Sequence, residues 1–253
     1  DIRGDLHIHT AYDFPVSHDL GASHLHEYLD RGAMFGYEYI GIADHNPKVT
    51  GMTKSQVLTI MKKRHDWYRE EYRKWQDKNG SKLKMFLLLE VDILTDGTLG
   101  IPEEAFDFID AAIVSVHSGF TQDRERITAR LIRALTAHRK VKILGHPTGR
   151  IIPRREGMDI SWNDIFALVK ERSIALEINA YPDRLDLPDR LVYDAVHCGV
   201  RCIIGTDSHH VDHLAYMPLG VSVARRGWAT KHDICTAMPY NTCKAWLTQN
   251  LAA

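Results

Sequence analysis

The sequence predicts an α/β fold in which about seven strands alternate with helices and close into a barrel. Short apolar runs alternate along the chain with longer segments of helical pattern, which is typical of βα units and a parallel sheet. Several runs are continuous, such as FLLLEV and AAIVSV, as expected of strands buried on both faces. Metal-capable side chains follow most of the runs directly, and the ends of barrel strands are where active sites form.

Each predicted strand is a short apolar run that ends at a polar residue or a glycine. The predicted strands cover residues 5–9, 39–43, 85–91, 111–116, 142–145, 175–179 and 202–205. Helices fill the gaps, because the intervening segments mix charged and apolar residues and carry cap and stop signals. The predicted helices cover residues 24–35 with Ser23 as N-cap, 53–77 followed by Gly80 as a stop, 123–137, 162–171, 188–198 and 240–251.

Composition limits the possible classes of protein. With 253 residues, 44% of them hydrophobic, the chain can bury one sizeable core, so we expect residues 1–253 to form a single domain. The net charge of -1 argues against a chain-wide electrostatic attraction for nucleic acid, although a local basic patch stays possible. Four cysteines without a CxxC pair favour a reducing cytoplasm, and no apolar run is long enough to span a membrane.

Histidines and carboxylates at the ends of the predicted strands form the candidate site. They are His7, His9, His45, Glu90, His117, His146, Asp207 and His209, and a ninth comes from the SHD stretch as His18 or Asp19. Each has an ordinary alternative, such as a core histidine or, for Glu90, an ion pair with an arginine. The repetition at strand ends favours a metal site, because structural histidines have no reason to prefer that position.

The ligand types indicate which ions the site would take. Imidazoles and carboxylates without thiolates suit manganese, zinc or iron, and eight or nine ligands suit two or three divalent ions. Such clusters bind phosphate groups and activate water near neutral pH. The sequence has no P-loop, GxGxxG motif or Ser-His-Asp order that would favour another chemistry.

The motifs DLHIHT, ADHN, EVD, SVHS, GHPTGR and GTDSHH together resemble the PHP family (polymerase and histidinol phosphatase). The resemblance runs from residue 5 to residue 209. It implies a distorted (β/α)7 barrel, similar to a TIM barrel, with a trinuclear metal centre at the carboxyl ends of the strands. The chain is most similar to the C-terminal PHP domain of bacterial and archaeal family X DNA polymerases, through stretches such as GYEYIGIADHNP and LEINAYPDRLDLPD. That group implies a manganese-dependent 3′–5′ exonuclease acting on DNA 3′ ends, with a polymerase module upstream in a longer chain.

The resemblance also implies three ion sites. His7, His9, Glu90 and Asp207 would hold the first ion, and Glu90 would bridge to a second ion held by His117 and His146. His45, His209 and one residue of the SHD stretch would hold the third. This sequence carries extra residues before that stretch, so the choice between Asp19, His18 and, less favourably, Asp13 stays open.

Substrate contacts are expected from the loops that follow the strands. Arg150 and Arg184 are the predicted phosphate-binding residues and Asn179 also faces the site. The alternative is that the two arginines pair with Asp159, Asp183 or Asp186 and only fix loops. Water activated by the ions would attack phosphorus without an obligatory protein base, and Asp207 and His209 are the candidates for shuttling the proton.

A second basic stretch and three other functions stay open. The segment 225–228 (RRGW) would bind a DNA backbone, or be a solvated surface with its tryptophan packed on the last helix.

The chain could instead be a phosphatase for small monophosphates, a scaffold for a polymerase, or a C–N hydrolase of an amidohydrolase type. A scaffold domain is expected to have lost metal ligands, and this sequence has kept them. An amidohydrolase is expected to carry a lysine at a strand end, and none is found there.

Overall fold

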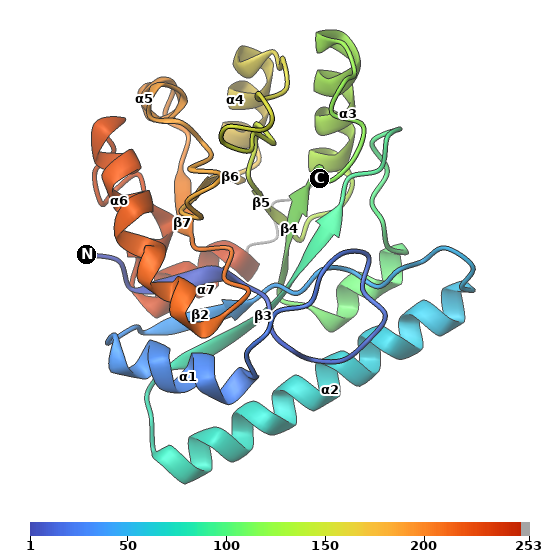
Figure 1. Cartoon of the computed structure of the whole chain (residues 1–253), viewed down its shortest axis with the longest axis vertical. Coiled ribbons are helices and arrows are strands. Elements are labelled where there is room, and N and C mark those ends of the chain that lie inside the picture. The colour runs from blue at the N-terminus through green and yellow to red at the C-terminus, as the bar shows by residue number, and fades with distance from the viewer. Residues whose placement is uncertain (249–253) are drawn as a thin grey trace.

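The strands run in chain order around a single parallel sheet that curves into a nearly closed barrel, with the helices outside it (Figure 1). This computed structural model describes residues 1–248, and those residues contain seven strands. They are β1 (Gly4–Ile8), β2 (Tyr39–Ile42), β3 (Lys84–Asp92), β4 (Ala111–Ser115), β5 (Val141–Leu144), β6 (Ala175–Asn179) and β7 (Cys202–Gly205). The fold is the predicted (β/α)7 TIM-like barrel, and no strand end differs from its predicted position by more than one residue.

The helices mostly follow the predicted pattern. They are α1 (Leu25–Met34), α2 (Lys54–Asn79), α3 (Arg124–Thr136), α4 (Trp162–Glu171), α5 (Asp189–His197), α6 (Met217–Arg226) and α7 (Tyr240–Thr248), with short 3-10 turns at η1 (Glu103–Phe108), η2 (Val211–Tyr216) and η3 (Cys235–Ala237). The predicted last helix is confirmed up to Thr248, and its final three positions lie outside the described residues. Among residues 1–248, none of the helices has the length and apolar character needed to cross a membrane.

One prediction about a helix end differs from the structure. Ser23 is not the N-cap of α1: His24 takes that position, and the Ser23 hydroxyl accepts a hydrogen bond from the Val211 N–H (3.0 Å). The serine is used to hold a distant loop, which local sequence does not reveal. At α2 the predicted stop at Gly80 is confirmed, since Gly80 ends the helix in the left-handed conformation, and Thr53, the predicted first residue, is the N-cap.

Helix α6 was not predicted, because Pro218 and Gly220 look like loop residues in sequence. The proline sits in the first turn, where no intrahelical donor is lost. Arg225 and Arg226 therefore end a helix instead of lying in a strand-end loop, and Arg226 pairs with Asp189 (2.7 Å). Trp228 is 72% exposed and does not pack on the last helix as the alternative reading expected.

Apolar side chains fill the barrel at the amino-terminal ends of the strands. Leu88, Ile113, Ile143 and Ile203 pack there in one cluster, and α7 adds Cys243, Trp246 and Leu247 to it. The Trp246 indole N–H donates to the carbonyl of Ser173, just before β6. The barrel is thus closed at one end by α7, and the polar site occupies the other end.

The seam between β1 and β7 is closed by a separate segment, residues 233–238. At the carboxyl end the strands meet directly, with the His9 N–H donating to the Ser208 carbonyl (2.8 Å). Further down, the Arg3 N–H donates to the Thr236 carbonyl (2.8 Å) and the Cys202 N–H to the Asp233 carbonyl (2.8 Å). The segment satisfies backbone groups that would otherwise form two open sheet edges.

Candidate metal centre

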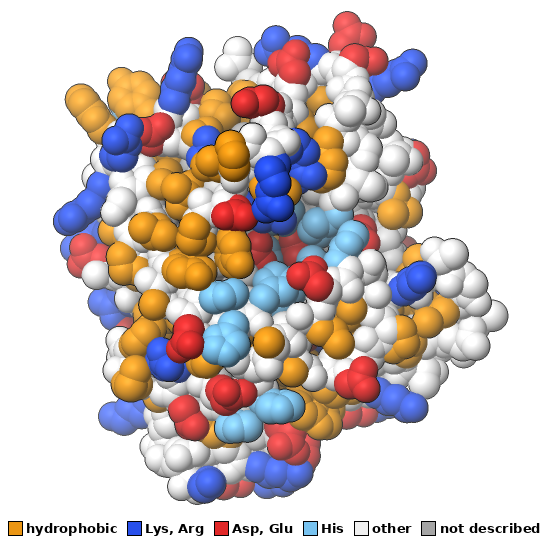
Figure 2. All heavy atoms as spheres, in the orientation of Figure 1, with side chains coloured by type: hydrophobic (Ala, Val, Ile, Leu, Met, Phe, Trp, Pro, Cys, Tyr) orange, Lys and Arg blue, Asp and Glu red, His pale blue; other side chains and the backbone are white. Residues whose placement is uncertain are grey.

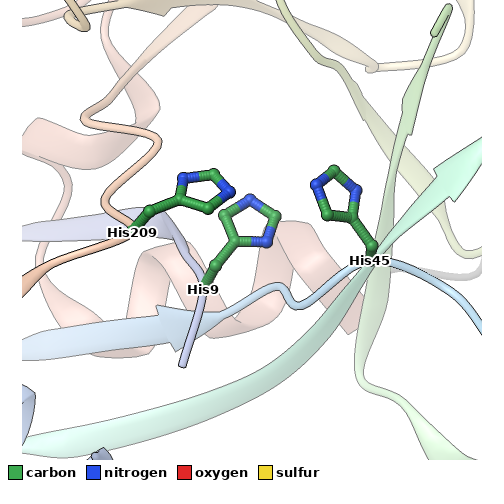
Figure 3. A group of neighbouring side chains, drawn as sticks. All are labelled: His9, His45 and His209. Carbon is green, nitrogen blue, oxygen red and sulfur yellow. The ribbon is translucent and has the colours of Figure 1, made fainter. Parts of the chain in front are cut away.

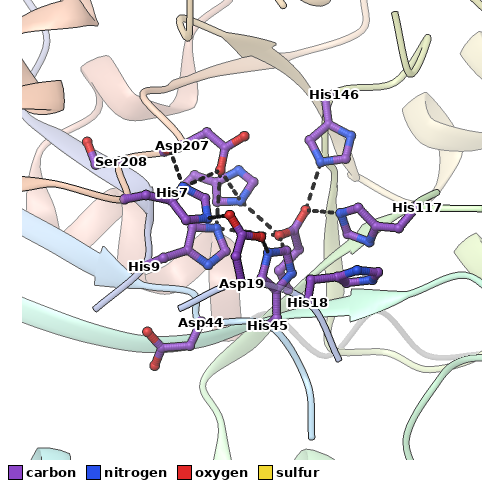
Figure 4. Close-up of polar contacts among 12 residues, drawn as sticks. His7, His9, His18, Asp19, Asp44, His45, His117, His146, Asp207 and Ser208 are labelled. Carbon is purple, nitrogen blue, oxygen red and sulfur yellow. Dashed lines mark hydrogen bonds and ion pairs between the residues drawn. The ribbon is translucent and has the colours of Figure 1, made fainter. Parts of the chain in front are cut away.

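The predicted metal ligands come together at the carboxyl ends of the strands (Figure 4). They arrive from β1, from β3, from the residues just after β2, β4, β5 and β7, and from the loop between β1 and α1. The set is His7, His9, His18, Asp19, His45, Glu90, His117, His146, Asp207 and His209. The structure brings all ten into one cluster, and their binding of ions stays a prediction.

Glu90 lies at the centre of this cluster and is fully buried on β3. Its Oε2 lies 3.4 Å from Nε2 of both His7 and His9, and 3.0 Å from Nδ1 of His45. Its Oε1 faces two further imidazoles. A buried carboxylate between imidazoles on both sides is placed to bridge cations, since each oxygen serves a different group of histidines.

The first group contains His7 on β1, His9 directly after β1, and two carboxylates. His9 Nε2 lies 3.2 Å from Asp207 Oδ1, His7 Nε2 lies 3.6 Å from the same oxygen, and both lie 3.4 Å from Glu90. An ion with tetrahedral bonds of about 2.1 Å holds its ligand atoms about 3.4 Å apart. The spacings of this group therefore fit one bound ion better than a set of direct hydrogen bonds.

The second group gathers around the other oxygen of Glu90. Oε1 lies 2.9 Å from His146 Nε2 and 3.4 Å from His117 Nε2. The His117 ring is oriented from behind, because its Nδ1 lies 2.7 Å from Asp92 Oδ1. Carboxylates commonly hold metal-binding histidines in this way. Asp92 thus supports His117, a ligand of this group.

The third group consists of His45, His209 and Asp19. Asp19 Oδ1 lies 3.5 Å from His45 Nε2, and Asp19 Oδ2 lies 3.5 Å from His209 Nε2. Figure 3 shows that His9 lies between the two histidines, with ring centroids 4.5 Å from His45 and 4.1 Å from His209. His9 thus adjoins the first and third groups.

The structure distinguishes the three residues left open for the third group. Asp19 is the one that lies between His45 and His209. His18 instead contacts Asp92 Oδ1 (2.9 Å) beside the second group, and Asp13 is exposed on the same loop. The path of this loop puts Asp19 beside the third group and His18 beside the second, and the extra residues in the sequence made that path unpredictable.

Buried polar atoms without partners concentrate in the cluster. Among residues 1–248, ten buried side-chain nitrogen or oxygen atoms have no hydrogen-bond partner, and seven belong to these ligands. The seven are His7 Nε2, His9 Nδ1 and Nε2, His45 Nδ1, Glu90 Oε2, His146 Nδ1 and His209 Nε2. Leaving such atoms unsatisfied is costly, and cations would satisfy most of them, so the residues fit bound metal ions.

The electrostatics of the cluster favour the ligand forms of several side chains. Burial, reinforced by the charge of Arg184, lowers the pKa of His146 to about 3, and burial with the neighbouring imidazoles lowers the pKa of His9 well below its usual range. Burial opposes ionisation of Glu90 and Asp207, but positive charge on the neighbouring histidines outweighs it and holds their pKa values low. Despite burial, the same carboxylates raise the pKa of His7, of His45 to about 10, and of His117, so a bound cation would have to displace protons from these three rings. Neutral imidazoles and ionised carboxylates are the forms that bind cations.

The backbone is strained at two of the ligands. His146 has a φ of 26° and Asp207 a φ of 52°, both in the left-handed region that residues with a side chain rarely adopt. Such conformations cost about 1–3 kcal/mol each and cluster at functional sites. Here they turn the second residue after β5 and the second residue after β7 toward the centre of the barrel.

Glu177 is a buried residue of the site that the sequence analysis missed. It lies on β6, with Oε1 2.6 Å from His7 Nδ1 and Oε2 accepting the His146 backbone N–H (2.7 Å). The signal was available, because a glutamate inside the apolar run ALEIN resembles Glu90 inside FLLLE. Gly205 makes room for it, since a Cβ at that position would lie 2.4 Å from Glu177 Oε1.

Asp44, directly before His45, ties a helix to the site. Its Oδ2 accepts from the buried Arg64 Nη2 (2.8 Å) and the Tyr68 hydroxyl (2.7 Å). Its Oδ1 accepts from the backbone N–H of Thr10 (2.7 Å). Helix α2, which carries Arg64 and Tyr68, is thereby tied to the residues that follow His9 and precede His45.

Of the three predicted substrate residues, Arg184 and Asn179 contact the cluster directly, whereas Arg150 contacts only a loop backbone. Arg184 Nε lies 3.4 Å from Asp207 Oδ2, and the Asn179 amide donates to the same oxygen (3.0 Å). Arg150 donates to the backbone carbonyls of Arg184 (2.8 Å) and Leu185, so it fixes this loop without pairing with an aspartate. Figure 2 shows histidine side chains reaching the surface in the middle of one face, with basic side chains beside them.

Fold and site together define a (β/α)7 barrel with a buried histidine–carboxylate cluster suited to divalent ions. No family model matches the chain. It is 34% identical over 251 residues to the DNA polymerase/3′-5′ exonuclease PolX of Bacillus subtilis, a match that covers 98% of this chain and 41% of that protein. It is also 26% identical over 217 residues to a probable phosphatase of Clostridium acetobutylicum, covering 81% of this chain and 78% of that protein. The chain thus spans less than half the length of the Bacillus relative.

Proposed function

We propose that this chain is a metal-dependent phosphoesterase of the PHP family that removes nucleotides from the 3′ ends of DNA. The observation that carries the proposal is the buried Glu90 carboxylate between five imidazoles, in a cluster rich in unpartnered ligand atoms. The names of the two relatives, an exonuclease and a probable phosphatase, support hydrolysis of phosphate esters as the common chemistry.

Three divalent ions, manganese or zinc, are the proposed cofactors, and each ligand group would hold one. His7, His9, Glu90 and Asp207 hold the first; Glu90, His117 and His146 the second. His45, His209 and Asp19 hold the third, with His18 beside the second group. Bound ions would supply Lewis acidity and lower the pKa of water, which is the usual chemistry of such clusters.

The protein side chains bind the phosphate and move the proton. Arg184 presents a partly exposed guanidinium beside Asp207, so it binds a phosphoryl oxygen and Asn179 fixes the carboxylate next to it. Asp207 faces His9 with one oxygen and Arg184 with the other, so it is placed to take up the proton of the attacking water. His209 is the alternative proton carrier in place of its role as a ligand of the third ion, because its Nδ1 is occupied by the Asp207 carbonyl (2.9 Å) and only Nε2 is left.

We also propose that residues 1–253 act as one domain joined to a polymerase module. The support is the Bacillus relative, whose length extends well beyond its match to this chain.

A phosphatase acting on small monophosphates is the second candidate. The Clostridium relative, named as a probable phosphatase, favours it, because the match covers 81% of this chain and 78% of that protein. The metal chemistry would be the same and the substrate pocket would differ.

One experiment separates the two functions. Mn²⁺-dependent shortening of a 5′-labelled single-stranded DNA is compared with phosphate release from nucleoside monophosphates and histidinol phosphate. His117→Ala removes a ligand of the second group and should lower the true activity at least about 100-fold. His232→Ala, at an exposed histidine outside the cluster, is the matched control and should keep full activity.

A ladder that shortens from the 3′ end and is lost in His117→Ala supports the exonuclease. Phosphate release with intact DNA replaces it with the second candidate. Activity that survives in His117→Ala would refute the proposed centre.

A further inference from the structure

We propose that Glu177 is a positioning residue whose one carboxylate orients ligands of the first and second ion sites at once. The inference rests on the proposed metal function and names a residue outside the ligand set. Glu177 is fully buried, and it reaches the cluster from the side opposite to Glu90.

The first oxygen of Glu177 fixes the His7 ring. Oε1 lies 2.6 Å from His7 Nδ1, while His7 Nε2 points toward Glu90 and Asp207. Since a carboxylate can only accept, Nδ1 must carry the proton in this contact. The lone pair of the neutral ring is then on Nε2, which is the nitrogen that faces the first group.

The second oxygen fixes two further ligands. Oε2 accepts the backbone N–H of His146 (2.7 Å), the residue whose φ of 26° turns its ring toward Glu90. The same oxygen accepts from the Asn179 amide (3.2 Å), which also donates to Asp207 Oδ2 (3.0 Å). One side chain therefore bears on His7 and Asp207 of the first group and on His146 of the second.

The neighbouring strand β7 makes room for this carboxylate. A Cβ at Gly205 would lie 2.4 Å from Oε1, so only a glycine leaves space for the carboxylate there. Both oxygens are occupied by donors at hydrogen-bond distance. Glu177 is thus a support for ligands and not a ligand itself, in the arrangement by which outer carboxylates tune metal-binding histidines.

Glu177→Gln tests the inference with almost no change in volume. If the amide NH₂ faces His7, it forces the ring proton onto Nε2 and blocks that ligand. If the amide is rotated by 180°, its NH₂ faces the N–H of His146 and the amide of Asn179, so both of these donors lose their acceptor. We expect Mn²⁺ affinity, measured by calorimetry and electron paramagnetic resonance on the whole chain, to fall about 10- to 100-fold.

A second readout separates positioning from a general structural role. The urea midpoint of the metal-free protein should stay close to the wild-type value, because the substitution also removes a buried charge. Glu171→Gln, at an exposed glutamate of α4, is the matched control and should bind Mn²⁺ like the wild type. Wild-type Mn²⁺ affinity in Glu177→Gln would overturn the inference, as would a loss of metal-free stability without a loss of affinity.

Two further arms keep the outcomes distinct. If Glu177→Gln does not fold, Glu177→Asp keeps the charge but withdraws the carboxylate by one methylene, and it should still bind Mn²⁺ at least several-fold more weakly; unchanged affinity there overturns the inference. If the wild type itself binds no Mn²⁺ or Zn²⁺, the proposed function fails, and the inference with it. Metal binding by the wild type that is unaltered in the variants refutes the inference alone.

Discussion

At the scale of single residues, the role of each buried carboxylate in the site depends on the groups that contact it. Glu90 and Glu177 both lie inside apolar strands, yet we propose that Glu90 binds ions and Glu177 orients ligands, because their neighbouring groups differ. Glu90 lies 2.9–3.4 Å from ring nitrogens that face the proposed ion sites. Both oxygens of Glu177 instead accept hydrogen bonds, one from the His7 ring and one from the His146 backbone N–H. An apolar run interrupted by one carboxylate therefore indicates a site, but the partners alone decide whether the residue binds an ion or supports a ligand.

Asp186 should give the stability of the chain a distinct pH dependence. Burial raises the pKa of its carboxyl to about 6, above the ordinary value of 3.8, although the Thr148 and Gly149 N–H groups bind it. The folded chain takes up this proton near pH 6 and the unfolded chain only near pH 4. The group thus stabilises the folded state as pH falls through that window, and this contribution is lost as pH rises through 6.

Asp186→Asn removes that titration. On lowering the pH from about 7.5 to about 5, the free energy of unfolding of the wild type should rise by about 1 kcal/mol relative to the variant. Urea unfolding in the presence of a chelator measures it, because the metal ligands then titrate alike in both proteins. A difference between wild type and variant that does not change with pH would contradict the expectation.

At the scale of elements, sequence patterns predicted most of the barrel. All seven strands were correct because each is a short apolar run flanked by polar residues or glycine, and helix α2 because Thr53 and Gly80 mark both ends. Helix α6 was missed since its packing, not its composition, makes it a helix: a Cβ at Gly220 would lie 2.4 Å from Ile204.

The site was predicted less completely, for a related reason. The ligands that follow strands share one rim by the geometry of parallel sheets, so their meeting was predictable. The contacts of Asp19, Asp44 and Glu177 depend on loop paths and on neighbours remote in sequence, which local patterns do not encode.

The cap of helix α2 should contribute measurably to stability. The Thr53 side chain accepts from the Gln56 N–H, and the Gln56 side chain accepts the Thr53 N–H (2.8 Å), which satisfies two donors at the start of the helix. Thr53→Ala should therefore lower the free energy of unfolding by about 1 kcal/mol. Thr59→Ala, on the exposed middle of the same helix, is the control and should change it by less than half as much. Equal effects of the two substitutions in urea unfolding would argue against the cap.

At the scale of the whole molecule, the candidate metal centre draws ligands from residue 7 to residue 209, so ion binding and global stability should be linked. Ions that bind only the folded chain stabilise it by about 2.7 kcal/mol per site at 100 times the dissociation constant. For a chain of this size that corresponds to a rise in Tm of about 5–10 °C per site. Calorimetric scans with Mn²⁺ and with a chelator measure it, and His117→Ala should show a smaller rise. An identical Tm under both conditions would speak against a metal centre.

The seam between β1 and β7 has a consequence for how the chain is made. Asp5 bonds to Thr206, 201 residues later, and Arg3 bonds to the carbonyl of Thr236. At a synthesis rate of ~5–20 residues per second, the first strand waits roughly 10–40 seconds for its last neighbour to emerge. During that interval β1 presents an unpaired edge, and this stage of biosynthesis is the one at which the newly made chain is most exposed to wrong strand pairing.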